Sequence, residues 1–157
     1  MEEDEYKSTY NELVSVRCVF EKALTNNQAR CSLSRHFCLA DREGYACNDV
    51  KSSIKCRKFI EILREKSTFV LKVHEIKGPL PHNMEIRVQV GGISGLAKLI
   101  DRQADKQTDR QLRQPVVEDI HGLINKTIEN MGPLETLPYS EIIQSVVRFK
   151  GRRRRQH

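Results

Sequence analysis

The sequence predicts an α+β protein: a mostly helical single domain with a small β-hairpin and an irregular loop that carries cysteines. Apolar residues recur at three- and four-residue spacing in several segments, and one segment alternates apolar with polar residues. Four of the five cysteines fall within 26 residues, three of them in a stretch without a sustained period. Because 157 residues is the usual size of one domain, we expect residues 1–150 to form it and residues 151–157 to be a basic, disordered tail.

Two helices are expected in the first half of the chain. The first covers about residues 6–24, because the apolar residues from Leu13 to Leu24 share one face. The second begins near Ser52 or Ser53, whose hydroxyls can cap free amides, and it runs to about Lys66.

A hairpin is expected next, with strands over residues 69–76 and 84–90 joined across residues 78–81. The second strand alternates four apolar residues with polar or charged ones. Such a small sheet needs cover, and helices are the available partners. Alternatively, residues 65–73 prolong the second helix.

The second half of the chain reads as helices separated by glycine and proline. Three glycines between residues 91 and 95 are expected to break the chain after the hairpin. Residues 96–113, rich in charged and amide side chains, follow as an exposed helix or a flexible connector. Another helix begins near Pro115 and ends before Gly132, and a last short helix covers residues 142–147.

The cysteines carry the clearest chemical signal. Cys31, Cys38, Cys47 and Cys56 fit the spacing C-x6-C-x8-C-x8-C, and an irregular loop over residues 29–49 followed by a helix can bring their sulfurs together. Thiolates are the ligands of iron–sulfur clusters and are also good ligands of zinc. These four cysteines are therefore the predicted metal ligands.

The spacing favours a [4Fe-4S] cluster over a [2Fe-2S] cluster, with zinc as the alternative. Zinc sites normally use cysteines in pairs two to four residues apart, and the sequence has no such pair. A cubane is larger, and single, widely spaced cysteines can reach its separate corners. Basic residues that would offset the thiolate charge flank the predicted ligands: Arg30, Arg35, Arg42, Lys51, Lys55, Arg57 and Lys58.

Two further residues are alternative ligands. Cys18 is expected to pack within the first helix, but it can replace one of the four cysteines if that helix folds over the loop. His36 lies between Cys31 and Cys38 and would complete a site of three cysteines and one histidine, although a solvated histidine is more common. The simplest alternative is that the thiols are scattered structural side chains without a metal.

The formal net charge of +6 is unevenly distributed. The first five residues hold four acids, unlike a cationic signal peptide, and no apolar run is long enough to cross a bilayer, so we expect a cytoplasmic protein without a membrane span. Near the other end, Arg152, Arg153, Arg154 and Arg155 either contact nucleic acid or an acidic partner, or form a solvated tail.

Four stretches look like motifs of a known family: Arg42-Glu43-Gly44-Tyr45-Ala46-Cys47, Leu63-Arg64-Glu65-Lys66, Gly91-Gly92-Ile93-Ser94-Gly95-Leu96, and Leu137-Pro138-Tyr139-Ser140-Glu141-Ile142 before the arginine run. With these motifs the chain resembles a bacterial family of small four-cysteine proteins whose members occur beside nitrogen-fixation and electron-transport genes. The resemblance implies an accessory iron–sulfur role with Cys31, Cys38, Cys47 and Cys56 as ligands. Composition and spacing by themselves give no link to nitrogen fixation.

The expected function is electron transfer, or an accessory redox role, in a larger complex with a protein partner. One alternative is a nucleic-acid-binding or regulatory protein stapled by zinc or a cluster, whose affinity would fall steeply with salt. Another is a metal-free interaction domain. The sequence holds no His-Glu-x-x-His helix and no Cys-x-x-Cys redox pair, so we expect no catalytic activity of its own.

Overall fold

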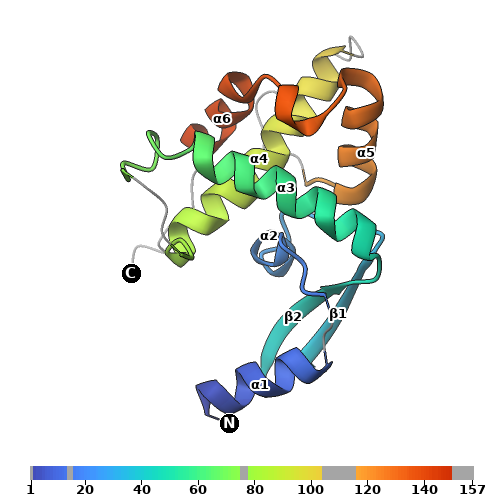
Figure 1. The fold of residues 1–157 in the computed structure, drawn as a ribbon, viewed down its shortest axis with the longest axis vertical. Coiled ribbons are helices and arrows are strands. Elements are labelled where there is room, and N and C mark those ends of the chain that lie inside the picture. Colours follow the sequence, from blue (N-terminus) through green and yellow to red (C-terminus); the bar gives the residue numbers. More distant parts are fainter. Residues whose placement is uncertain (1, 14–15, 75–77, 104–115, 150–157) are drawn as a thin grey trace, which may run out of the picture.

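The computed structural model describes residues 2–13, 16–74, 78–103 and 116–149, which are mostly helical with one two-stranded antiparallel sheet (Figure 1). The elements are α1 (Glu3–Leu13), α2 (Glu21–Thr25), β1 (Ser34–Leu39), β2 (Arg42–Cys47), α3 (Val50–Lys66), α4 (His82–Gln103), α5 (Ile120–Met131), the 3-10 helix η2 (Leu134–Thr136) and α6 (Tyr139–Arg148). The predicted class, a mostly helical α+β domain with a small hairpin, is confirmed. In these ranges no helix is long and apolar enough to cross a membrane.

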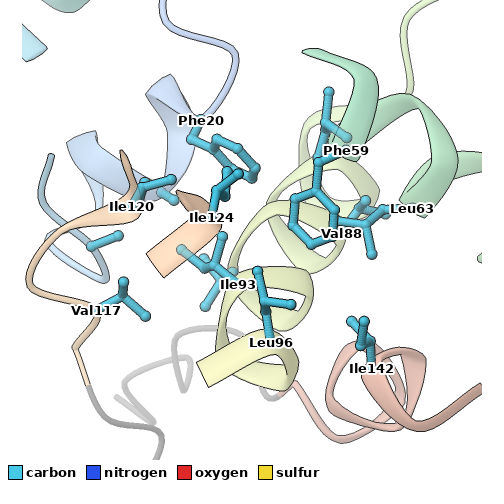
Figure 2. Packing of buried hydrophobic residues seen from close by; sticks show 14 of the residues in the cluster. Phe20, Phe59, Leu63, Val88, Ile93, Leu96, Val117, Ile120, Ile124 and Ile142 are labelled. Atoms are coloured by element: carbon cyan, nitrogen blue, oxygen red, sulfur yellow. The ribbon is translucent and has the colours of Figure 1, made fainter. Parts of the chain in front are cut away.

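Helix α4 forms the centre of the hydrophobic core. Its residues from Val88 to Ile100 are mostly buried, and α3, α5, α6 and the residues before α2 pack around it (Figure 2). Fully buried apolar side chains contributed by these neighbours include Phe20, Phe59, Leu63, Ile120, Ile124 and Ile142. Each such side chain stabilises the fold by about 1.5–3 kcal/mol because it leaves water.

Helix α6 crosses α4 at two glycines. A Cβ atom added to Gly91 would lie 2.5 Å from the Cα atom of Val146, and one added to Gly95 would lie 2.4 Å from the carbonyl oxygen of Ile142. The two backbones therefore approach more closely than a residue with a Cβ atom allows. Our prediction that these glycines break the chain was wrong, because they lie inside α4 and leave room for the backbone of α6 to pack against it.

The strand predicted over residues 84–90 is also wrong, because these residues form the first turns of α4. Its period-two pattern arises from polar side chains that face inward. Glu85 is buried and accepts hydrogen bonds from Arg64 Nε at 3.1 Å and from Gln89 Nε2 at 3.0 Å. Gln89 Oε1 accepts the backbone N–H of Ala23 at 3.1 Å. Buried polar residues with satisfied hydrogen bonds thus resemble, in sequence, the exposed face of a strand.

The segment after α4's glycines is helical as far as the structure describes it. Leu96, Leu99 and Ile100 are buried in the last turns of α4, whereas Arg102 is exposed. Of the exposed helix or flexible connector that we expected from residue 96, the helix is therefore correct for this part, and exposure along its whole length is wrong. The remainder of that prediction, residues 104–113, lies outside the described residues.

The hairpin occurs earlier in the chain, in the region that we predicted to be an irregular loop. Strands β1 and β2 pair along their whole length, and Ala40 and Asp41, with φ of 50° and 65°, form the turn between them. This turn lacks the Asn-Gly or Asp-Gly signal that usually marks such a hairpin in a sequence. Of the partner strand predicted over residues 69–76, residues 69–72 form turns after α3, and residues 75–76 lie outside the described residues. The hairpin and α1 project from the helical body (Figure 1).

Two helix boundaries differ from the predictions because short backbone pairings replace helix. The single helix predicted over residues 6–24 is divided into α1 and α2, since residues 16–18 pair with β2. Helix α5 begins at Ile120, later than predicted, because Val117 forms a parallel bridge with Ala29. Helix α3, the end of α5 and the last short helix, α6, agree with the predictions.

Candidate metal centre

Four cysteines from four separate segments line one cavity. Cys18 precedes α2, Cys31 precedes β1, Cys47 ends β2, and Cys56 lies in the second turn of α3. The cavity is therefore at the junction of the projecting hairpin with the helical body (Figure 1). Its volume is about 20 Å³, which is room for a single water molecule. A cluster at this place would need the surrounding side chains to move apart.

Backbone pairing brings Cys18 and Cys47 together. The N–H of Cys18 donates to the carbonyl of Tyr45 at 3.0 Å, and the N–H of Cys47 donates to the carbonyl of Val16 at 2.9 Å. Residues 16–18 thus pair with β2 through an isolated antiparallel bridge between Arg17 and Ala46. Because side chains alternate across a strand, Cys18 and Cys47 lie on the same face of this small sheet.

Helix α5 positions Cys31. The N–H of Arg30 donates to the carbonyl of Val117 at 2.8 Å, and the next residue but one, Ser32, donates from its N–H and its hydroxyl to Asp119 Oδ1 at 3.0 and 3.1 Å. Burial alone would raise the pKa of Asp119, but the hydrogen bonds from Ser32 outweigh it, so this pKa lies below its usual value. The ionised carboxylate therefore fixes the Cys31 segment at the start of α5.

The first turns of α3 complete the site. Ser52 and Ser53 are buried and line the cavity together with Cys56. The hydroxyl of Ser52 donates to Asp49 Oδ2 at 2.6 Å, and this hydrogen bond lowers the pKa of Asp49. The free amides of a helix start carry partial positive charge, so α3 brings an environment that favours thiolates to the cavity.

The electrostatics of the site keep its most buried sulfurs protonated. Burial and, to a smaller extent, the neighbouring thiols raise the pKa of Cys18 and of Cys56 to about 12. Burial also raises the pKa of Cys31. The backbone N–H groups of Leu33 and His121 favour its thiolate and so lower this pKa, but their effect is smaller than that of burial. Cys18 and Cys56 are therefore neutral at pH 7, and a bound metal would be needed to hold them as thiolates.

Within the ranges that the structure describes, no three or more His, Cys, Asp or Glu side chains are arranged to hold a metal ion. The thiol of Cys47, for example, donates to the carbonyl oxygen of Asp49 at 3.2 Å. Metal binding would therefore require the sulfurs to turn toward a common centre, and ligation stays a prediction.

Other residues predicted at the site lie elsewhere. Cys38 is exposed near the turn of the hairpin, four residues along β1 from Ser34, which is about 13 Å of strand. His36 is also exposed on β1, with its ring 5.0 Å from that of Tyr45 and its Nε2 atom 3.8 Å from Glu43. Neither lines the cavity. The arginine run over residues 152–155 lies outside the described residues.

Two residues of the cavity were not among the four predicted ligands. His121 was not predicted at the site, and Cys18 was predicted only as an alternative ligand. His121 lines the cavity from the start of α5, with Nε2 3.1 Å from the side-chain nitrogen of Asn125. No local pattern marks it, because the cysteines that line the cavity with it are 65 or more residues away in sequence. A signal for Cys18 exists: valines at residues 14, 16 and 19 favour a strand over the helix that we predicted.

The cavity wall offers four sulfur atoms and the imidazole of His121 as donors. The hydroxyls of Ser34 and Ser52, which also line it, are engaged with the carbonyl of Cys31 and the carboxylate of Asp49. Sulfur donors of this kind suit a thiophilic metal ion or an iron–sulfur cluster. No family model, no curated protein and no solved structure matches the chain.

Proposed function

We propose that Cys18, Cys31, Cys47 and Cys56 bind a [4Fe-4S] cluster, and that the protein transfers electrons, or has an accessory redox role, in a larger complex. The observation that supports this proposal is the convergence of four of the five cysteines on one cavity. The proposed set differs by one residue from the set predicted by spacing, because Cys18 takes the place of the exposed Cys38.

The spacing of the new set favours a cluster over zinc for the same reason as before. The four cysteines now read C-x12-C-x15-C-x8-C, so each ligand comes alone from its own segment. Zinc sites normally draw cysteines in close pairs from a tight turn. The irons of a cubane lie at separate corners, which suits four cysteines that approach from different directions.

Hydrogen bonds around the sulfurs support the same assignment. Backbone N–H groups of Leu33 and His121 favour the thiolate of Cys31, and that of Phe20 favours the thiolate of Cys18. Such N–H donors stabilise the negative charge of a ligated cluster and raise its reduction potential. The start of α3 adds to this effect because its partial charge is positive.

The test is the iron, sulfide and zinc content of protein purified without oxygen, or reconstituted with iron and sulfide, together with its visible spectrum. We expect about four irons and four sulfides per chain and a brown chromophore, as for one cubane. One zinc per chain would contradict the cluster and favour the regulatory alternative. Protein that takes up neither iron nor zinc would leave only the metal-free alternative.

A further inference from the structure

The first turns of α3 present an outer face made only of basic and large apolar side chains. Val50 and Ile54 stand one turn apart and are 60% and 61% exposed. The other exposed residues of these turns are all basic, and with the apolar pair they make up what we call the basic face: Val50, Lys51, Ile54, Lys55, Arg57 and Lys58. The second half of α3 differs, because its exposed residues Glu61, Glu65 and Lys66 carry both signs.

The first turn of α3 departs from the normal preference of a helix. Acidic residues stabilise the start of a helix and basic residues its end. Asp49 at the N-cap and Arg64 and Lys66 in the last turn follow this rule, whereas the first turn holds Lys51 and no acid. Departures from such local rules are expected where a surface has a function.

Part of the charge on the basic face is not neutralised. Lys58 pairs with Glu135, and Lys55 donates to the side-chain oxygen of Asn125 at 3.2 Å. Lys51 and Arg57 have no charged or hydrogen-bonded side-chain partner in the described part of the chain. These two cations are therefore free to meet charges on another molecule.

We propose that the basic face is the docking surface for an acidic electron-carrier protein. The proposal rests on the cluster proposed above, because the carrier would exchange electrons with it. Ser53 and Cys56, from the same turns of α3, line the cysteine cavity on the other side of the helix. Since a helix with its side chains is about 10–12 Å wide, a docked protein would lie about one helix width from the Cys56 sulfur.

The composition of the basic face favours a protein partner over nucleic acid. An exposed apolar pair surrounded by charged residues has the arrangement of a protein interface, with an apolar centre and a polar rim. Redox complexes are transient and use small interfaces, and complementary charge speeds their association. Single-stranded nucleic acid is usually held by aromatic stacking besides phosphate contacts, and the basic face has no aromatic side chain.

The experiment measures electron transfer between the cluster-loaded protein and a plant-type [2Fe-2S] ferredoxin, an acidic one-electron carrier, by stopped flow. One electron leaves the reduced ferredoxin and enters the oxidised [4Fe-4S] cluster, and no proton or covalent bond is transferred. The test variant is Lys51→Glu with Arg57→Glu. The control is Lys66→Glu with Lys72→Glu, two exposed lysines at and beyond the far end of α3, so the net charge changes equally.

We expect the test variant to lower the second-order rate constant at low salt at least tenfold and to remove most of its salt dependence. The control should stay within about twofold of the unmodified protein. The test variant should also fold, because both residues are exposed and Lys51→Glu places an acid in the first turn of α3. The iron content of each protein is measured first, so that the two proposals can fail separately. Unmodified protein that binds no iron would contradict the cluster. Equal rate constants in cluster-loaded test and control variants would contradict the docking face.

A parallel titration with a single-stranded DNA 20-mer addresses the other class of partner. We expect no saturable binding at physiological salt. Saturable, salt-dependent binding that the test variant loses, combined with an unchanged ferredoxin rate, would overturn the protein partner in favour of nucleic acid.

Discussion

The crossing of α4 with α6 and the cysteine junction both bring distant segments close together, but by different means. At the crossing, Gly91 and Gly95 let two backbones meet, and fully buried aliphatic side chains surround them. At the junction, four thiols and several serines line a cavity that is held by backbone pairing and by Asp119. The crossing is filled by side chains and needs no ligand, whereas the thiols at the junction are groups that a ligand could bind.

The contrast extends to the hairpin, which depends on the junction. Its own apolar cluster contains one fully buried residue, Ala46, with Tyr6, Phe37 and Leu39 partly buried around it. Such a cluster contributes little stability compared with the core around α4. We infer that the helical body folds without a metal and that a metal bound at the junction, as proposed above, would fix the hairpin to it.

The largest expected effect is at the crossing, where Gly95→Ala should lower the free energy of unfolding by about 2 kcal/mol. Alanine favours a helix more than glycine does by about 1 kcal/mol, but its Cβ atom would lie 2.4 Å from the carbonyl oxygen of Ile142. The matched control is Gly92→Ala, whose Cβ atom would meet only the flexible end of Leu63 at 2.4 Å. Urea unfolding measures both, and equal destabilisation would contradict a backbone contact at Gly95.

A smaller effect is expected at the junction from Asp119→Ala. The change removes the carboxylate that accepts both hydrogen bonds of Ser32, so we expect a loss of about 1–2 kcal/mol in unfolding free energy. The variant should also lose its iron sooner after dilution than the unmodified protein does, because the Cys31 segment is no longer fixed. The control is Glu118→Ala, since Glu118 is exposed and, among the described residues, its ion pair is with the exposed Arg30. If both variants kept iron equally long, Asp119 would have no part in the site.

The effect that is smallest at neutral pH, and that grows with alkaline pH, is a loss of stability in protein without metal. Cys18 and Cys56 have pKa values of about 12 in the folded chain, against an ordinary value near 9, so the folded state holds more protons between these values. Stability should therefore be full below pH 9 and decrease as pH rises toward 12. Urea unfolding at pH 7, 8.5 and 10 measures this decrease.

Two comparisons sharpen the pH prediction. Replacing both cysteines, with Cys18→Ser and Cys56→Ser, should reduce the decrease, because serine does not ionise in this range. Loaded protein should not show it, since its sulfurs are already thiolates. A decrease of the same size in the double variant would assign the pH dependence to other groups.

Patterns within one segment could be predicted from the sequence, and contacts between segments could not. The class, α3 and α6 followed from apolar periodicity and caps, which are local. The hairpin was misplaced because Glu85 and Gln89 find buried partners on other helices, so a helical segment alternates like a strand. The true hairpin has a turn of Ala40 and Asp41, which gives no usual turn signal.

At the candidate site, too, local patterns could be predicted from the sequence and contacts between segments could not. A cysteine-rich segment with basic neighbours was visible in the sequence, and three of the four cysteines that line the cavity were in the predicted set. The exchange of Cys38 for Cys18 depends on the pairing of residues 16–18 with β2, a contact across 28 residues of chain. His121 joins the site only through the packing of α5.

The most direct test of the account is the cluster content of two single variants, Cys18→Ser and Cys38→Ser, purified without oxygen and reconstituted alike. We predict that Cys18→Ser loses the chromophore and most of its iron and sulfide, because it removes a cavity sulfur. Cys38→Ser should keep about four irons per chain, since Cys38 is exposed near the hairpin turn. A cluster that survives in Cys18→Ser and is lost in Cys38→Ser would contradict the proposed ligand set and restore the one predicted by spacing.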